Sequence, residues 1–386
     1  MEEWKERKLK DICDYGKGRT EVSSLDNSTY ISTENMLPNR AGVTTATTLP
    51  TGEYTPSFEI DDTLVSNIRP YFKKIWKASF SGGCSADVLV FKAKENISKD
   101  YLYYVLADDE FFKYSMATSK GTKMPRGDKV SIMEYPIKLP SLPTQQKIAA
   151  ILSSLDDKIE LNNKINTNLE QQAQALFKNW FVDKYEKEGA IGDYCAVKSG
   201  FAFKSAWWQD EGTKVIRIGD IEQGNLNLET CAHVANDKIE VAKDFLVQGG
   251  DLVIAMTGAT IGKFSMIPKT QEPILVNQRV GKFFLGNNPI EKVPFIYCTL
   301  KQEEVITEFI NRGQGSAQPN ISTGDILSIP CWIPNKNEID NFNKTIHPMF
   351  ETIISNQEEN RKLSSIRDSL LPKLMNGEIE VNKVLL

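Results

Sequence analysis

Two stretches of the chain carry the clearest hydrophobic pattern, in which apolar residues alternate at spacings of four and three. The first stripe runs from Ile148 to Trp180, and the second runs from Phe342 to Leu374 at a constant offset of 194 residues. This spacing matches the a and d positions of a heptad and predicts a long helix in each stretch. A helix of about 33 residues reaches about 50 Å, which is too long for packing on one domain alone. We therefore expect the two helices to pack against each other.

Asparagines interrupt both stripes at equivalent places. Asn162 and Asn166 lie in the first stripe, and Asn356 and Asn360 lie in the second. Buried asparagines fix register in coiled coils. We therefore expect an antiparallel pair that places Asn162 opposite Asn360 and Asn166 opposite Asn356, so that facing residue numbers sum to 522. The same register places Arg367 opposite a leucine, and we expect its charged head to reach solvent.

The segments before the two stripes also match each other in order. Leu9–Cys13 corresponds to Ile191–Cys195, and the glycine and proline of Gly121–Pro125 return in Gly315–Pro319. Many weak matches in one fixed order indicate an internal duplication. If the duplication is real, the two halves should share one topology.

Each half mixes short apolar runs with glycine and proline turn signals, which is typical of a mixed α/β domain. Tyr101–Phe112 and Pro294–Ile310 read as helical. We predict an α+β chain with two pseudo-symmetric mixed α/β domains, separated by two long helices that form an antiparallel coiled coil. The expected boundaries are 1–142 for the first domain, 143–185 for the first spacer helix, 186–335 for the second domain, 336–376 for the second spacer helix and 377–386 for a C-terminal tail.

Composition and charge exclude few classes of function. The 386 residues are 40% hydrophobic and 25% charged, with a net charge of −5, as in an ordinary globular protein. Residues 1–142 carry 20 basic and 20 acidic side chains, and residues 189–335 carry 13 and 16. Neither segment is basic in bulk, so any DNA contact must come from local patches. No apolar run approaches the ~20 residues of a membrane helix, and the charged N-terminus shows no signal core. We expect a cytoplasmic protein with no membrane partner, whose six scattered cysteines are reduced and mostly buried.

Motifs for catalysis are missing from the sequence. The stretch Met256–Phe264 resembles a phosphate-binding loop, but Thr257 stands where the motif needs glycine and Phe264 where it needs Ser or Thr. No dinucleotide fingerprint, no N-P-P-aromatic tetrapeptide of amino-methyltransferases and no nuclease cluster is found. Only two histidines occur, His233 and His347, and although Cys231 lies two residues before His233, the chain has no C-x-x-C pair, so we expect no zinc site. We therefore expect no catalytic residue, no cofactor and no metal in this chain.

What remains is a set of loops rich in Arg, Lys, Asn, Gln and aromatic residues. Lys and Arg can neutralise phosphates, and Arg, Asn and Gln can bind guanine or adenine edges in the major groove. The loops of the two halves differ in sequence while their framing glycines and prolines persist, which favours two DNA readers on one scaffold. For each single residue, a solvated turn remains the alternative. The predicted DNA-binding residues are Lys17, Arg19, Arg69, Tyr71, Lys73, Lys74, Thr122, Lys123, Arg126, Lys204, Thr257, Thr260, Lys263, Gln278, Arg279, Ser316, Gln318 and Asn320.

The organisation resembles the specificity subunit of type I restriction–modification systems. The most specific match is Leu370-Leu371-Pro372-Lys373-Leu374-Met375-Asn376-Gly377-Glu378-Ile379, which is similar to the family's L-L-P-K-L-x-x-G-E-I ending. Leu139–Ile148 resembles the P-L-P-P-L-x-E-Q entry to the first conserved helix, with Ser141 and Gln145 departing from it. Ile333–Ile339 is a more degenerate second copy. The similarity covers essentially the whole chain.

The resemblance implies a non-catalytic subunit in which 1–142 and 186–335 are target-recognition domains that bind double-stranded DNA, one half-site per domain. It further implies two methyltransferase subunits and restriction/translocase subunits as partners, which would hold S-adenosylmethionine, ATP and magnesium. Two rival interpretations remain: a coiled-coil scaffold that binds only proteins, and a solitary DNA methyltransferase or nuclease fusion. No code relates such loops to bases, so the sequence leaves the target bases open.

Overall fold

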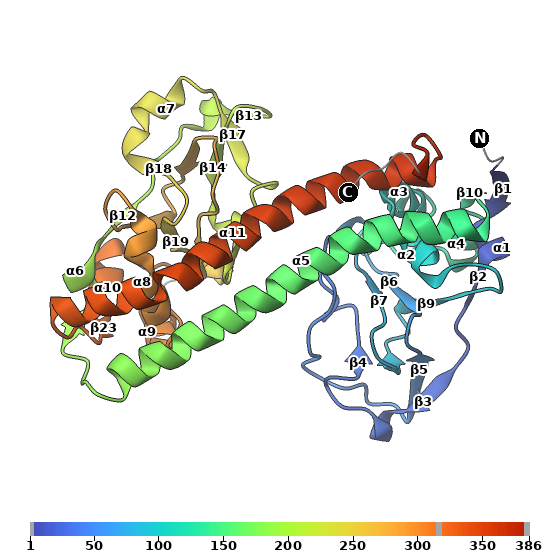
Figure 1. Cartoon of the computed structure of the whole chain (residues 1–386), viewed down its shortest axis with the longest axis horizontal. Coiled ribbons are helices and arrows are strands. Elements are labelled where there is room, and N and C mark those ends of the chain that lie inside the picture. Colours follow the sequence, from blue (N-terminus) through green and yellow to red (C-terminus); the bar gives the residue numbers. More distant parts are fainter. Residues whose placement is uncertain (1–3, 314–318, 382–386) are drawn as a thin grey trace. The chain divides into compact units, whose positions relative to one another are not determined.

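The computed structural model describes residues 4–313 and 319–381 and divides into two compact units. Of the described residues, the first unit comprises 4–158 and 363–381, and the second comprises 159–313 and 319–362. Figure 1 shows both units with their elements labelled. Each of the two longest helices, α5 (Leu142–Phe177) and α11 (Lys336–Met375), contributes one segment to each unit.

The first unit is built on a four-stranded sheet of order β2-β9-β6-β7, whose strands lie side by side in Figure 1. A second sheet has the order β3-β5-β8-β4, and β1 pairs with β10. The strands are β1 (Lys5–Lys8), β2 (Cys13–Tyr15), β3 (Arg19–Glu21), β4 (Tyr30–Ile31), β5 (Tyr54–Phe58), β6 (Thr63–Ser66), β7 (Ile75–Lys77), β8 (Gly82–Cys84), β9 (Val88–Ala93) and β10 (Pro136–Leu139). The short helices are α1 (Leu9–Ile12), α2 (Lys99–Ala107), α3 (Asp109–Ala117) and α4 (Lys129–Met133).

The second unit repeats this plan with additions. Its four-stranded sheet has the order β12-β22-β19-β20, β11 pairs with β23, and a five-stranded sheet has the order β13-β17-β14-β21-β18. The strands are β11 (Gly189–Ala190), β12 (Ala196–Ser199), β13 (Trp208–Gln209), β14 (Thr213–Ile216), β15 (Ile221–Glu222), β16 (Asn225–Leu226), β17 (Ala232–Val234), β18 (Leu246–Val247), β19 (Leu252–Ala255), β20 (Phe264–Met266), β21 (Ile274–Val276), β22 (Val280–Phe284) and β23 (Pro330–Cys331). The helices are α6 (Ile191–Tyr194), α7 (Lys238–Val241), α8 (Val293–Leu300), α9 (Glu303–Gly313) and α10 (Thr323–Leu327).

The expected common topology is confirmed when each unit is compared by itself. In chain order, β2, β6, β7 and β9 correspond to β12, β19, β20 and β22, and the order of strands in the two four-stranded sheets is the same. Both units also contain a parallel pair, β4 with β8 and β14 with β21. The second unit adds the β15–β16 hairpin and attaches β17 and β13 beside β14.

The two helical segments expected within the domains are each divided in two. The first is α2 and α3, separated at Asp108, whose carboxylate accepts a hydrogen bond of 3.0 Å from the amide of Glu110 and so starts a new helix. The second is α8 and α9, separated at Lys301 and Gln302. The apolar pattern could not show these breaks because both members of each pair bury apolar residues in the same core.

Within each unit, one segment of α5 and one of α11 share a core. In the first unit Ile148 and Leu152 of α5 are buried in one cluster with Leu371 and Leu374 of α11. In the second unit Phe177 of α5 lies in a cluster with Phe342, Ile346, Phe350 and Ile353 of α11. The heptad stripes are therefore core-facing in both units. After Phe177, α5 continues as a π-helical turn, Lys178–Val182.

The asparagine pairs lie where the register of 522 places them. In the second unit Asn162 donates to Asn360 at 2.9 Å, and Asn356 donates to Asn166 at 2.8 Å. The expectation for Arg367 is wrong. Its side chain is only 14% exposed, because Nη1 donates to Asp156 of α5 at 2.7 Å and the carboxylate of Asp368 lies at 2.9 Å. A paired carboxylate, rather than solvent, satisfies this guanidinium.

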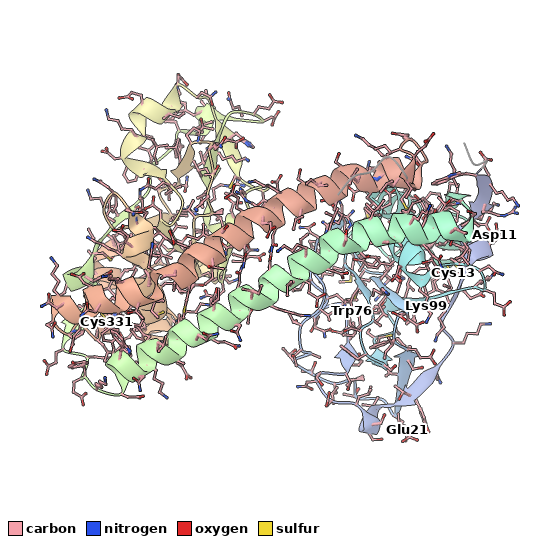
Figure 2. All side chains as sticks on the ribbon, viewed as in Figure 1. Asp11, Cys13, Glu21, Trp76, Lys99 and Cys331 are labelled. Atoms are coloured by element: carbon pink, nitrogen blue, oxygen red, sulfur yellow. The ribbon has the colours of Figure 1, made fainter. Side chains whose placement is uncertain are left out.

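All six cysteines are buried and free, as expected. Figure 2 labels Cys13 in the first unit and Cys331 in the second. Burial raises the pKa of both thiols to about 12, so neither is a reactive thiolate at neutral pH. No helix among residues 4–313 and 319–381 is long and apolar enough to span a membrane.

Candidate nucleic-acid interface

Two predicted loops of the first unit lie against each other. One follows β6 and contains the 3-10 turn η2 (Pro70–Phe72), and the other includes Gly121 to Gly127. The amide of Arg69 donates to the carbonyl of Pro125 at 2.8 Å, and a β-bridge joins Ile68 to Arg126. We call this pair of loops, residues 67–74 and 120–127, the first loop cluster.

The second unit forms a matching arrangement after β19. The 3-10 turn η7 (Gly258–Thr260) follows the strand, the amide of Gly258 donates to the carbonyl of Pro319 at 2.9 Å, and a β-bridge joins Thr257 to Asn320. The amide of Met256 also donates to the carbonyl of Arg279 at 3.0 Å. We call residues 256–263, 277–279 and 319–320 the second loop cluster. The predicted residues Ser316 and Gln318 lie outside the described residues.

The two clusters use the same backbone links at equivalent positions. The link from Arg69 to Pro125 corresponds to the link from Gly258 to Pro319. The number of residues between the two donors differs from that between the two acceptors, because each segment of the repeat has its own offset. The two β-bridges correspond in the same way. A third link, from the amide of Asn67 to the carbonyl of Asp87 at 2.8 Å, corresponds to the one from Met256 to Arg279. The duplicated scaffold therefore presents different side chains from one backbone frame.

Two positions of the first cluster hold a left-handed backbone with bulky residues. Arg69 has φ of 49° and Lys73 has φ of 50°, whereas glycines stand at the equivalent positions, Gly258 with φ of 74° and Gly262 with φ of 80°. Residues with a Cβ pay about 1–2 kcal/mol for this conformation. Strained backbone conformations of this kind are concentrated at functional sites, and here both strained residues carry a cationic side chain.

The cations that follow η2 are anchored by partners. Lys73 forms an ion pair with Asp109 at 2.9 Å, and Arg40 pairs with the same carboxylate. Burial alone would raise the pKa of Asp109, but the bond from Lys73 and the two positive charges lower it overall. Lys74 donates to the carbonyl of Thr33 at 2.6 Å, and burial lowers its pKa. These contacts hold the loop in place and leave its aromatic residues, Tyr71 and Phe72, exposed.

The second cluster encloses a pocket of about 590 Å³. Thr257, Gln278, Arg279 and Asn320 all line it, so the structure brings these four predicted residues together. The hydroxyl oxygen of Thr257 is buried and has no hydrogen-bond partner among the described residues. The pocket thus offers two amide side chains and one guanidinium, which are groups that can bind base edges or phosphates.

Other predicted residues lie in different elements. Lys17 precedes β3, and Arg19 lies in β3, which pairs with β5 in the second sheet of the first unit. Lys204 lies 5.5 Å from the centre of the Trp207 ring at the start of a 3-10 turn. The remaining predicted residues stay with the clusters: Thr122 and Lys123 are exposed in the loop before Pro125, and Thr260 and Lys263 lie in and after η7.

Three residues that contact the first loop cluster were not predicted from the sequence. Asp87 accepts from Arg126 at 3.1 Å, and Arg40 and Asp109 hold the η2 loop through Lys73. Asp87 and Arg126 are separated by 39 residues, so no local pattern links them. One signal in the sequence could have revealed this pair. An acidic residue stands directly before the apolar run Val88–Phe91, and an arginine stands in the loop that recurs in both halves.

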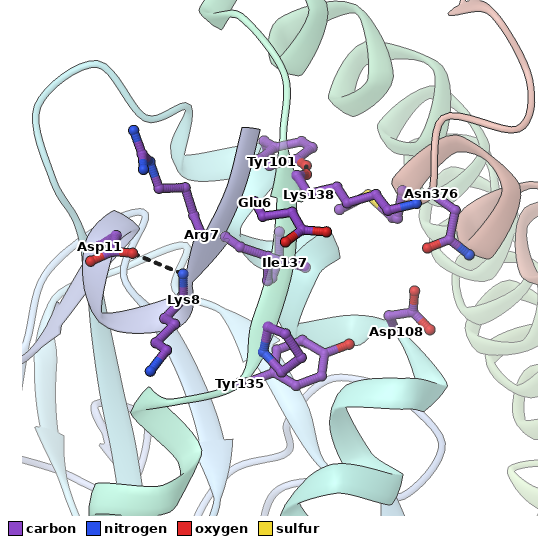
Figure 3. A pocket seen from close by; sticks show the side chains of 13 residues that line it. Glu6, Arg7, Lys8, Asp11, Tyr101, Asp108, Tyr135, Ile137, Lys138 and Asn376 are labelled. Carbon is purple, nitrogen blue, oxygen red and sulfur yellow. Dashed lines mark hydrogen bonds between the residues drawn. The ribbon is translucent and has the colours of Figure 1, made fainter. Parts of the chain in front are cut away.

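A further pocket of about 560 Å³ lies in the first unit beside the β1–β10 pair. Figure 3 shows that its lining mixes Glu6, Asp11 and Asp108 with Lys8 and Lys138. The amide of Lys8 donates to Asp11 at 2.8 Å, the bond drawn as a dashed line. None of the predicted DNA-binding residues lines this pocket, and its mixed charge does not favour a polyanion. Within 4–313 and 319–381, no group of three His, Cys, Asp or Glu side chains could hold a metal ion.

Comparison with known proteins gives a consistent result. The type I restriction enzyme HindI specificity subunit of Haemophilus influenzae is 26% identical over 464 residues, which cover 98% of this chain and 100% of that protein. The MjaVIII specificity subunit of Methanocaldococcus jannaschii is 27% identical over 412 residues, with coverage of 99% and 94%. The crystal structure of the type I restriction–modification S subunit from M. genitalium is similar in fold, with a TM-score of 0.56, 18% identity and coverage of 97% and 96%.

The family model described as the type I restriction modification DNA specificity domain matches the chain twice, over residues 1–171 and 184–366. The two matches correspond to the two halves that the offset of 194 residues relates. Because the matches cover most of the sequence, this chain belongs to the family of type I restriction modification DNA specificity domains.

Proposed function

We propose that the chain is the DNA-recognition subunit of a type I restriction–modification complex and binds a bipartite DNA target. Residues 1–142 read one half-site and residues 186–335 read the other. The observation that carries this proposal is the pair of loop clusters, built with the same backbone links but different side chains. A duplicated frame with diverged loops suits a protein that reads two different short sequences.

The long helices have a separate role in the proposal. Residues 143–185 and 336–376 form an antiparallel coiled coil that spaces the recognition domains, and residues 377–386 are a tail. The asparagine bonds at 2.9 and 2.8 Å and the shared cores of each unit support this pairing. Two methyltransferase subunits and restriction/translocase subunits dock on the chain and bring S-adenosylmethionine, ATP and magnesium. The chain itself is non-catalytic.

The test starts from the full chain with the methyltransferase subunits of its host. Methylation-sensitive sequencing of cells that contain this complex gives the target sequence. Duplexes are then prepared with the whole target, with either half-site scrambled, or with both scrambled, and binding is measured between 50 and 200 mM salt. We expect tight binding only to the whole target, and weaker, more salt-dependent binding when either half is scrambled. Equal binding of all four duplexes would contradict the proposal.

The two rival functions give different results in the same system. A scaffold that binds only proteins would assemble with the methyltransferase subunits but add no sequence preference to DNA binding. A solitary methyltransferase would transfer a labelled methyl group to DNA as the purified chain alone, without its partners. We expect methyl transfer only when the partner subunits are present.

A further inference from the structure

Two equivalent backbone positions carry different chemistry in the two units. The first position is residue 87 in one unit and residue 279 in the other, because the carbonyl groups of Asp87 and Arg279 accept the equivalent links from Asn67 and Met256. The second position is residue 126 or 320, because Arg126 and Asn320 form the equivalent β-bridges. The first unit thus pairs an acid with an arginine where the second unit has an arginine and an amide.

In the first unit the two side chains contact each other. Nη2 of Arg126 lies 3.1 Å from the carboxylate of Asp87, and the side chains are 55% and 34% exposed. The carboxylate occupies one edge of the guanidinium and limits its motion, while other N–H donors stay accessible to a ligand. A phosphate oxygen approaching this pair would be repelled by Asp87, whereas a neutral base edge would not. The pair therefore favours a base over the DNA backbone.

The donor and acceptor pattern of this pair fits one base pair. Arginine can donate two hydrogen bonds to O6 and N7 of guanine, and an aspartate can accept from the N4 amino group of cytosine. A G·C pair presents both groups in the major groove. The combination of Arg126 with Asp87 is therefore complementary to G·C, and an A·T pair would leave the carboxylate opposite an acceptor or a methyl group.

The second unit offers a different pattern at the same positions. Asn320 is an amide and can bind N6 and N7 of adenine bidentately, with Gln278 beside it in the pocket of about 590 Å³. Arg279 makes no ion pair with any carboxylate in the described part of the chain, so its charge is available for a phosphate.

We propose that the equivalent positions of the two frames select different purines, through residues 87 and 126 in the first unit and through residue 320 in the second. Asp87 and Arg126 select one G·C pair in the first half-site. Asn320 selects one adenine in the second half-site, and Arg279 contacts the backbone beside it. This inference rests on the proposed DNA-recognition function and names the residues that perform it.

The test uses the complete complex with its methyltransferase subunits and the target found by sequencing. Each base pair of both half-sites is replaced in turn by the other three, and binding is measured for the native chain and its variants. Arg126→Asn should reduce the preference for G·C at one position of the first half-site by about 5- to 150-fold, the range for one lost bidentate contact. Every preference in the second half-site should remain. Asn320→Ala should reduce the preference for adenine at one position of the second half-site and leave every preference in the first half-site unchanged.

Asp87→Asn separates base reading from a structural role. It removes the carboxylate but keeps the arginine, which can then bind a phosphate. We expect the same G·C preference to weaken while total affinity is kept and its dependence on salt increases by about one counterion. Arg126→Lys should also relax this position, because lysine keeps the charge but loses the planar fork. Lys113→Ala, on the exposed face of α3, is the matched control and should change no preference.

The outcomes distinguish this inference from the proposed function. If the native complex shows no sequence preference, both fall. If the native complex has a bipartite target but Arg126→Asn weakens all duplexes equally, the inference is wrong and the proposed function stands. A variant that keeps its preferences in the second half-site has folded. If Arg126→Asn loses the preferences in both half-sites, Arg126→Lys, which keeps the charge, tests the inference in its place. A G·C preference unchanged in Arg126→Lys and Asp87→Asn would also overturn the inference.

Discussion

Arg69 adopts the left-handed backbone conformation at the position where the second unit has Gly258, with φ of 49° and 74° respectively. Both amides donate to a proline carbonyl, Pro125 in one unit and Pro319 in the other, so the backbone conformation belongs to the scaffold. Glycine adopts this conformation without strain, whereas arginine does not. Arg69 therefore differs from Gly258 by a guanidinium added to the shared backbone frame, and its Nε is buried without a hydrogen-bond partner among the described residues.

Replacing Arg69 by glycine and by alanine separates the side chain from the backbone. Both Arg69→Gly and Arg69→Ala remove the guanidinium, so both should weaken DNA binding equally. Alanine keeps the left-handed strain, while glycine relieves it but gains entropy in the unfolded chain. We expect Arg69→Gly to be more stable than Arg69→Ala by up to about 1 kcal/mol, as measured by denaturant unfolding. Native DNA affinity in both variants would mean that Arg69 has only a structural role.

The ion pair between Asp156 and Arg367 joins α5 to α11 within the first unit. Asp156 also accepts a hydrogen bond of 2.7 Å from the hydroxyl of Tyr104, and the Arg367 side chain is largely buried. We expect Asp156→Ala to reduce the free energy of unfolding by about 1.5–3 kcal/mol, because it leaves a buried guanidinium without its main partner.

A double-mutant cycle tests this coupling. Asp156→Ala combined with Arg367→Leu should cost less than the sum of the two single changes, since the leucine restores an apolar residue to the heptad stripe. Additive losses would show that the two side chains do not interact in solution. Lys164→Ala serves as a control, because Lys164 forms only an exposed pair with Glu160 on the surface of α5.

Part of the site could be predicted from the sequence, and the missing part has a physical explanation. Pro125 and its counterpart Pro319 marked the loops correctly, because both prolines accept the equivalent backbone links of the duplicated frame. The asparagines marked the helix register for a similar reason. Asp87 was missed and the expectation for Arg367 was wrong, because the roles of both residues depend on partners that only folding brings close. An ion pair between residues that are far apart in the sequence leaves no periodic pattern along the chain.

Asp128 fixes the loop of the first cluster through a carboxylate with an unusually low pKa. The hydrogen bond from Lys120, 2.5 Å long, and that from the amide of Ser131, 2.9 Å long, lower its pKa from 3.8 to about 2. A lowered pKa in the folded state means that the stabilisation is present above about pH 4 and is lost as the pH falls towards 2. The carboxyl carbon signal in NMR should therefore remain at its ionised position at pH 4, where an ordinary aspartate is about half protonated.

Lys120→Ala provides the control for this titration. It removes the first cause of the shift and leaves the helix cap to Ser131 in place, so the midpoint should rise part of the way towards 3.8. A midpoint that does not move would mean that the cap alone lowers the pKa and that Lys120 does not hold the loop.

The last prediction concerns the proposed role of α5 and α11 as the spacer between the two half-sites. In the register of 522, seven residues can be inserted after Lys158 of α5 and seven after Leu363 of α11 so that every facing pair on either side is kept. The insertion lengthens each helix by about 10 Å and keeps the apolar stripes in phase. At about 3.4 Å per base pair this corresponds to about three base pairs of DNA, or about a third of a turn. The variant should therefore lose binding to the native target and prefer a target whose half-sites are separated by additional base pairs, which a library of duplexes with varied spacers would reveal.

A four-residue insertion in α5 alone is the control, since it breaks the register and should abolish recognition of every spacer. Native preference for the original spacer after the paired insertion would show that the helices do not measure the distance between the half-sites.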